Sequence, residues 1–244
     1  MSDSVIRIAM WSGPRNISTA MMRAWENRAD CDVVDEPFYA CYLSKTGIVH
    51  PMQDEVLASQ EQEWQAVIDG ELSKPLKQGV TLQYQKHMTQ HMVEDVDSNW
   101  FATLRHAFLI RHPAEVVFSY AKKRDSVTAE DIGFKRQREL FDQVCALGAT
   151  PPVIESNDVL RDPENMLSKL CQALQVDFDQ SMLAWPRGQR DSDGVWAAHW
   201  YQNVEKSTGF APYTPRDIEL SPEQQRVVDQ CLDDYQALAQ HKLV

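Results

Sequence analysis

Short apolar runs alternate along this chain with longer stretches in which apolar residues recur every three or four positions. The short runs predict buried strands, and the longer stretches predict amphipathic helices. The runs that predict strands are Ile6–Met10, Cys31–Asp35, Gly79–His87, His106–Ile110 and Pro152–Ile154. Helical spacing follows Ser18-Thr19 and recurs in Asp54–Leu72, after Pro113, in Thr128–Leu147, in Asp162–Leu174 and after Ser221.

This alternation predicts one α/β domain over residues 1–244, with a mostly parallel central sheet flanked by helices. No stretch of the sequence has the composition of a linker between two domains. Residues 185–220 contain Gly, Arg and Trp without clear periodicity, so we expect this segment to cover an active site.

Composition narrows the classes of function. The 244 residues carry a formal net charge of -12, which argues against nucleic-acid binding by a general basic surface. An anionic ligand would therefore need a local cluster of cations. Five scattered cysteines indicate a reduced, cytoplasmic setting, and the polar N-terminus does not resemble a signal peptide. No apolar run is long enough to span a membrane.

The segment Ile6–Trp25 predicts an anion site. Its apolar strand is broken by Ser12-Gly13-Pro14, and Arg15-Asn16-Ile17-Ser18-Thr19 then leads into a helix. The first N–H groups of a helix lack partners and the helix dipole is positive there, so a phosphate fits this geometry. The loop lacks the Lys-Ser/Thr pair that closes the nucleoside-triphosphate loop. An ordinary strand-to-helix turn with Ser18 as N-cap explains the same residues.

Four segments together resemble the sulfotransferase family, which uses 3'-phosphoadenosine-5'-phosphosulfate (PAPS) as sulfuryl donor. The stretch Gly13–Thr19 is similar to the family's 5'-phosphosulfate loop, with Arg15 in place of the usual Lys. Arg111, followed eight residues later by Ser119, resembles the 3'-phosphate motif. Residues 155–164 and 187–199 resemble, more loosely, two further family segments downstream.

The resemblance implies residue roles. Gly13, Pro14, Arg15, Asn16, Ile17, Ser18 and Thr19 would bind the 5'-phosphosulfate, and Arg111 with Ser119 the 3'-phosphate. Arg187 is a candidate for a second contact to the 3'-phosphate. The implied reaction is in-line transfer of the sulfuryl group to a hydroxyl or amine of a small metabolite, without a metal. His87 and His91 are four residues apart, but no third metal ligand adjoins them.

Two residues compete for the role of general base. His87 follows Lys86 at a strand end, as the catalytic His of cytosolic sulfotransferases does, and Lys86 would belong to the catalytic group. Glu36, in Asp35-Glu36-Pro37-Phe38, resembles the carboxylate base of some bacterial and carbohydrate sulfotransferases. An unperturbed imidazole titrates near 6.5 and a Glu near 4.3, which favours His87 as the proton acceptor.

Two other functions fit parts of the pattern. The chain could be a non-catalytic adenine-nucleotide-binding relative, although such a protein has no need of the polar strand-end residues Glu36, Lys86 and His87. It could also be a small-molecule kinase, against which the missing loop lysine argues. The sequence identifies neither the acceptor nor the oligomeric state.

Overall fold

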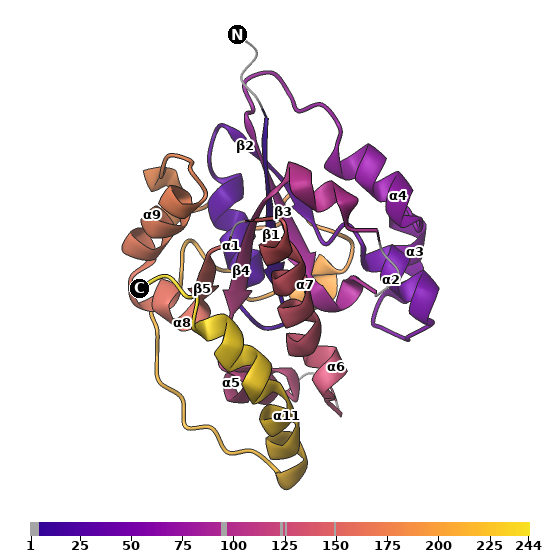
Figure 1. Cartoon of the computed structure of the whole chain (residues 1–244), viewed down its shortest axis with the longest axis vertical. Helices are drawn as coiled ribbons and strands as arrows, with labels where there is room; N and C mark the ends of the chain where they lie inside the picture. The colour runs from indigo at the N-terminus through magenta and orange to yellow at the C-terminus, as the bar shows by residue number, and fades with distance from the viewer. Residues whose placement is uncertain (1–4, 94–96, 123, 125, 149) are drawn as a thin grey trace.

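Five parallel strands form a central sheet in the computed structural model, which describes residues 5–93, 97–122, 124, 126–148 and 150–244 (Figure 1). The strands are β1 (Ile6–Ser12), β2 (Cys31–Asp35), β3 (Leu82–Met88), β4 (Arg105–Ile110) and β5 (Val153–Glu155), in the spatial order β2-β3-β1-β4-β5. All four neighbouring pairs are parallel. The predicted single α/β architecture with a parallel sheet is confirmed.

Helices cover both faces of this sheet (Figure 1). The α-helices are α1 (Ser18–Glu26), α2 (Tyr39–Thr46), α3 (Gln53–Ser59), α4 (Trp64–Val67), α5 (Pro113–Tyr120), α6 (Ala129–Ile132), α7 (Phe134–Ala146), α8 (Ser156–Arg161), α9 (Pro163–Ala173), α10 (Ala197–Trp200) and α11 (Pro222–Ala239). Shorter helical turns are the π-helical η1 (Ile68–Leu72) and the 3-10 turns η2 (Thr89–His91), η3 (Asn99–Thr103) and η4 (Gln180–Leu183). None of the helices in these described ranges is long and apolar enough to cross a membrane.

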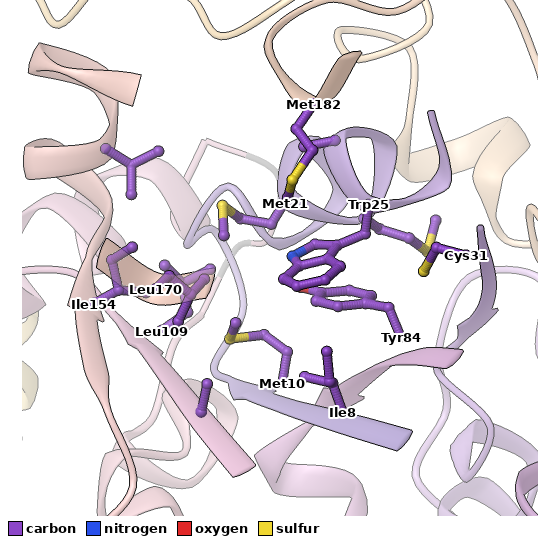
Figure 2. Close-up of a cluster of buried hydrophobic side chains, with 14 of the residues drawn as sticks. Ile8, Met10, Met21, Trp25, Cys31, Tyr84, Leu109, Ile154, Leu170 and Met182 are labelled. Carbon is purple, nitrogen blue, oxygen red and sulfur yellow. The ribbon is translucent and has the colours of Figure 1, made fainter. Parts of the chain in front are cut away.

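Strand alternation divides the core into two layers. Ile8 and Tyr84 face α1, where the indole of Trp25 stacks on Tyr84 with ring centroids 5.3 Å apart (Figure 2). Trp11 and Phe108 face the opposite side and pack in the layer that contains residues of α7. Both faces of the sheet are therefore buried, as is usual for parallel sheets.

Two of the predicted helices are broken. The stretch Asp54–Leu72 folds as α3, α4 and η1, because Gln60 and Glu63 adopt extended backbone between the first two. Thr128–Leu147 folds as α6 and α7, which meet at Gly133 with φ 75°. The expectation of one continuous helix in each place was wrong. Two consecutive short helices can show the same apolar spacing as one long helix, although the backbone changes direction between them.

Predictions based on helix caps are confirmed. The Asp162 side chain accepts a hydrogen bond from the N–H of Asn165 at the start of α9. Ser221 and Gln224 form a reciprocal capping box at the start of α11. Helix α8 follows directly on β5, and α2 begins at Tyr39 after β2 ends at Asp35; neither helix was predicted.

Candidate active site

A cavity of about 410 Å³ opens at the carboxyl ends of the strands. The loop 14–19 after β1 lines it, together with Glu36 after β2, Lys86 on β3 and Arg111 after β4. β1 is central, with β3 on one side and β4 on the other, so the loop lies where the strand order reverses. Ligands of open α/β sheets bind at such a position. The segment between residues 200 and 216 contributes another wall.

Hydrogen bonds to β4 and to the start of α8 fix the loop after β1. The buried Asn16 donates from Nδ2 to the carbonyl oxygen of Leu109 (3.2 Å), and the Ser156 hydroxyl lies 3.0 Å from the carbonyl oxygen of Asn16. Arg15 (φ 62°) and Ile17 (φ 57°) adopt left-handed backbone, which is uncommon for residues with a side chain. Such conformations persist where the surroundings impose them, and they mark candidate binding sites.

The start of α1 is open to an anion. Ile17, not Ser18, is its N-cap, no side chain caps it, and its first turn contains no acidic residue. The interpretation of this stretch as an ordinary turn capped by Ser18 is therefore wrong. Neither the Ser18 nor the Thr19 hydroxyl is hydrogen-bonded to another residue in the described part of the chain. First-turn N–H groups and two hydroxyls thus remain for a ligand.

Three arginines meet at this end of the cavity. Arg15 donates from Nε to the Ser119 hydroxyl (3.1 Å), and Arg111 donates from Nη1 to the carbonyl oxygen of Arg15 (3.1 Å). Arg216, from the segment before α11, lines the same cavity. Burial lowers the pKa of Arg15, and the charges of Arg111 and Arg216 lower it further. A cluster of cations in so acidic a protein calls for an anionic ligand.

Arg111 is held in place by an acid on α5, the helix that begins two residues after it. Glu115 accepts from its Nε and Nη2 (3.0 and 2.6 Å), and Asn157 donates to the other oxygen of Glu115. The structure therefore brings together Arg15, Arg111 and Ser119, which belong to two separate sequence motifs.

Arg187 does not belong to this cluster. Its side chain is exposed and lies outside the cavity, so the expected contact to the 3'-phosphate has no structural basis. The irregular segment instead turns back through residues 203–211, and Arg216 reaches the cavity. Sequence reasoning missed Arg216, because an arginine in a stretch without periodicity carries no positional signal.

His87 is also misplaced by the sequence-based prediction. Successive residues of a strand point to opposite faces, so Lys86 faces the cavity and His87 the opposite layer. There its ring stacks between Trp11 (4.4 Å) and Phe38 (5.6 Å), and 1% of the residue is exposed. Burial lowers the pKa of His87 to about 3. We therefore withdraw the expectation that His87 is the base: it is a core residue that cannot reach an acceptor.

Lys86 is the centre of a buried hydrogen-bond cluster. Its Nζ contacts Asp35 Oδ1 (2.8 Å), Glu36 Oε1 (2.5 Å) and the hydroxyl of Tyr201 (2.7 Å). An ammonium has three N–H donors, so all of them are used within the cluster. Lys86 therefore has no N–H donor left for a substrate, and the catalytic role expected of it is limited to its contacts with Asp35, Glu36 and Tyr201.

Glu36 is the carboxylate that faces the cavity. It follows β2 with a left-handed backbone (φ 42°), and its N–H donates to the carbonyl oxygen of Lys86 (2.9 Å). Burial raises the pKa of Glu36 and the charge of Asp35 raises it further, whereas Lys86 opposes both. A carboxylate whose pKa is raised in this way, in a cleft, is a stronger base than an exposed one and a candidate proton acceptor.

The comparison with known families agrees with this arrangement. A family model described as "Sulfotransferase domain" matches residues 6–239. The chain belongs to the sulfotransferase domain family. The resemblance that the four sequence segments suggested is confirmed.

Solved sulfotransferases share the fold of this family member. The sulfotransferase domain of the Synechococcus PCC 7002 olefin synthase superposes with a TM-score of 0.53 at 15% identity, over 93% of this chain and 95% of that one. A sulfotransferase from Alicyclobacillus acidocaldarius gives 0.52 at 12% identity, over 99% and 98%. A mouse sulfotransferase solved in complex with PAP gives 0.50 at 11% identity, over 98% and 88%.

Curated relatives are longer than this sulfotransferase-family chain. The branched-chain-amino-acid aminotransferase-like proteins 2 and 1 of Arabidopsis thaliana are 32% identical over 234 residues and 36% identical over 220 residues. The matches cover 96% and 88% of this chain but 41% and 38% of those proteins. The chain thus spans about two fifths of their length.

The remaining cavity wall of this sulfotransferase-domain protein is aromatic. Tyr39 stacks on His91 with centroids 4.5 Å apart, and its hydroxyl lies 2.8 Å from Nδ1 of His50. Burial lowers the pKa of both His50 and His91, so these imidazoles are neutral at pH 7. No group of three or more His, Cys, Asp or Glu side chains within the described ranges is arranged to hold a metal ion.

Proposed function

We propose that this protein is a sulfotransferase that moves a sulfuryl group from PAPS to a hydroxyl, or an amine, of a small metabolite. One observation carries the proposal: a cluster of three arginines beside an uncapped helix start shares a single cavity with a buried carboxylate, Glu36. The arginines match the charge of a donor with two anionic groups. The carboxylate supplies the base that the transfer requires.

The donor's two anionic groups have separate partners. The 5'-phosphosulfate would lie at the start of α1, against the first-turn N–H groups and the hydroxyls of Ser18 and Thr19. The 3'-phosphate would lie against Arg111 and Ser119, where the arginine fork can make two parallel bonds. Arg15 adjoins both positions, since it belongs to the loop before α1 and its side chain contacts Ser119.

The reaction is an in-line displacement at sulfur. An acceptor oxygen forms a bond to sulfur while the bond from sulfur to the bridging phosphate oxygen breaks. The acceptor proton passes to Glu36, and the leaving phosphate takes the electron pair under the charge of Arg15. Positioning and charge stabilisation supply most of the rate enhancement for such a transfer. The products are a sulfate ester, or a sulfamate from an amine, and adenosine 3',5'-bisphosphate.

A non-catalytic adenine-nucleotide-binding protein is the second candidate. Such a protein needs the arginines but has no use for a carboxylate that burial drives toward its neutral form. A small-molecule kinase is less well supported, because residues 13–19 contain no Lys-Ser/Thr pair of the kind that closes a nucleoside-triphosphate loop. The two Arabidopsis relatives extend well beyond this chain, so any joint activity with an aminotransferase-like part is a question for the longer proteins.

Nucleotide binding is tested by thermal shift. Adenosine 3',5'-bisphosphate should raise the melting temperature by mass action, and AMP should do so far less because it lacks the 3'-phosphate. Arg111→Ala should abolish the difference between the two ligands. Arg187→Ala is the matched control, since that arginine is exposed outside the cavity, and it should keep the difference. Equal stabilisation by the two ligands in the wild type would contradict the site assigned to the 3'-phosphate.

A second assay separates the enzyme from the binding protein. With PAPS and a panel of phenols, alcohols and amines, Glu36→Gln should lower turnover by roughly 10²–10⁴, the range for losing a general base. The bisphosphate should still raise the melting temperature of that variant. Unchanged turnover in Glu36→Gln would remove Glu36 from the mechanism, and binding without turnover of any acceptor would favour the non-catalytic alternative.

A further inference from the structure

The buried cluster around Lys86 contains two carboxylates and one ammonium. Asp35 and Glu36 are adjacent at the end of β2, and both contact the same Nζ. The side chains of Lys86 and Asp35 are each 1% exposed, so solvent does not screen them. With Tyr201 neutral, the cluster holds one surplus negative charge. A buried surplus of this kind is relieved when one carboxylate takes up a proton.

The hydrogen bonds show which carboxylate can take the proton. Asp35 accepts from Lys86, from the hydroxyl of Tyr201 (2.8 and 2.7 Å to its two oxygens) and from the N–H of Gly194 (3.3 Å). Glu36 accepts through Oε1, and Oε2 receives no hydrogen bond from any residue that the structure describes. Asp35 thus has three hydrogen-bond donors, whereas Glu36 keeps an open oxygen and faces the cavity.

We propose that Asp35, which does not line the cavity, makes Glu36 a stronger base. Asp35 shares the positive charge of Lys86, so that the negative charge of Glu36 is only partly neutralised. This inference rests on the proposed function. Asp35 is a positioning residue, because it acts through Lys86 and touches no reacting atom. In the transfer, the acceptor O–H bond breaks, its oxygen bonds to sulfur, and the proton goes to Oε2 of Glu36.

The segment after η4 completes the cluster. Tyr201 follows α10, and the indole N–H of Trp196 donates to its hydroxyl (3.2 Å). A Cβ atom on residue 194 would lie 2.1 Å from the ring of Trp196. The position therefore needs glycine, whose backbone N–H donates to Asp35. The expected covering segment therefore supplies two of the hydrogen-bond donors to Asp35.

Other groups around Glu36 do not compete with this assignment. The titratable groups that face it are Lys86 from β3, Asp35 from β2, Tyr39 from α2 and Tyr201. Burial raises the pKa of both tyrosines, so they stay neutral. His50 and His91 lie beyond Tyr39 and are neutral as well. Lys86 is thus the one cation, and Asp35 the one other anion, among the described groups in this set.

The test is the pH dependence of turnover in Asp35→Asn. Without the Asp35 charge, Lys86 pairs with Glu36 alone, so Glu36 binds its proton less tightly. The acid limb of the kcat profile should move down by about one pH unit or more. Asp35→Glu should restore the limb, since it restores the charge. Arg187→Ala is the control: it removes a charge that is exposed outside the cavity, and its limb should stay in place.

An acid limb that does not move in Asp35→Asn, while Glu36→Gln is inactive, would overturn the role of Asp35 and leave the proposed function intact. Normal turnover in Glu36→Gln would instead overturn the proposed base. Should Asp35→Asn not fold, infrared difference titration of the wild type against Glu36→Gln reads the Glu36 carboxyl directly. The proposal requires it to titrate above its ordinary value, about 4.3, and titration at or below that value contradicts it.

Discussion

At the scale of single residues, the alternation of side chains along β3 decides which of two neighbours faces the cavity. Lys86 and His87 are neighbours in the sequence, yet one points into the cavity and the other into the aromatic layer against Trp11. A histidine buried in this way contributes to packing, and its low pKa is a consequence of that burial.

We predict that His87→Ala destabilises the fold without altering the chemistry. Removing a ring stacked between two aromatic residues should cost about 2–4 kcal/mol of unfolding free energy, measured by urea denaturation. The acid limb of the transfer profile should coincide with that of the wild type, because the proposed base is Glu36. A stable His87→Ala protein with no turnover would return His87 to the mechanism.

At the scale of elements, the loop after β1 depends on contact with α6. A Cβ atom on Gly13 would lie 2.5 Å from the carbonyl oxygen of Ile132, the last residue of α6. No side chain fits at that distance, so the loop or α6 must move if Gly13 is replaced. The loop carries Arg15 and the start of α1, so a shift there reaches the proposed donor site directly.

Gly13→Ala should therefore lower stability by about 1–3 kcal/mol and weaken binding of the bisphosphate. Gly70→Ala is a matched control: no atom lies within 4 Å of its added Cβ, and its φ is not positive. It should leave both stability and binding close to wild type. Binding is measured by calorimetric titration and stability by urea denaturation. Equal behaviour of the two variants would show that the contact with α6 is not limiting.

At the scale of the whole molecule, buried histidines link stability to pH. Burial lowers the pKa of His87 to about 3 and that of His106 to about 4. In the unfolded chain both titrate near 6.5, so below that pH the unfolded state binds protons that the folded state does not. Their stabilising effect is full above 6.5 and is lost as the pH falls toward 4. Glu155 opposes them, because burial raises its pKa to about 7 and the folded state then holds the proton.

Comparison with His87→Phe isolates one of these protons. As the pH is lowered from 6.5 to 4, the unfolding free energy of the wild type minus that of the variant should decrease by about 1.4 kcal/mol for each pH unit. The variant keeps a ring in the same layer but cannot titrate. Urea denaturation at several pH values measures the difference. Parallel pH curves for the two proteins would contradict the neutral, buried state of His87.

Local patterns in the sequence determined the elements and the donor loop. Apolar runs located all five strands, and capping residues located the starts of α9 and α11, because these features depend on neighbours a few positions away. The resemblance of the segments that contain Arg15, Arg111 and Ser119 to sulfotransferase motifs implied a site for an anionic donor. The structure then placed these three residues within hydrogen-bond contact.

Only the tertiary structure decided which residues share the cavity. The choice between Glu36 and His87 depended on which face of β3 is covered by aromatic side chains, and that follows from packing across the sheet. Arg216 and Tyr201 come from a segment without periodicity, so their positions depend on contacts with distant residues. The cluster of Asp35, Glu36, Lys86 and Tyr201 forms because parallel strands end at the same edge, where residues far apart in the chain exchange hydrogen bonds.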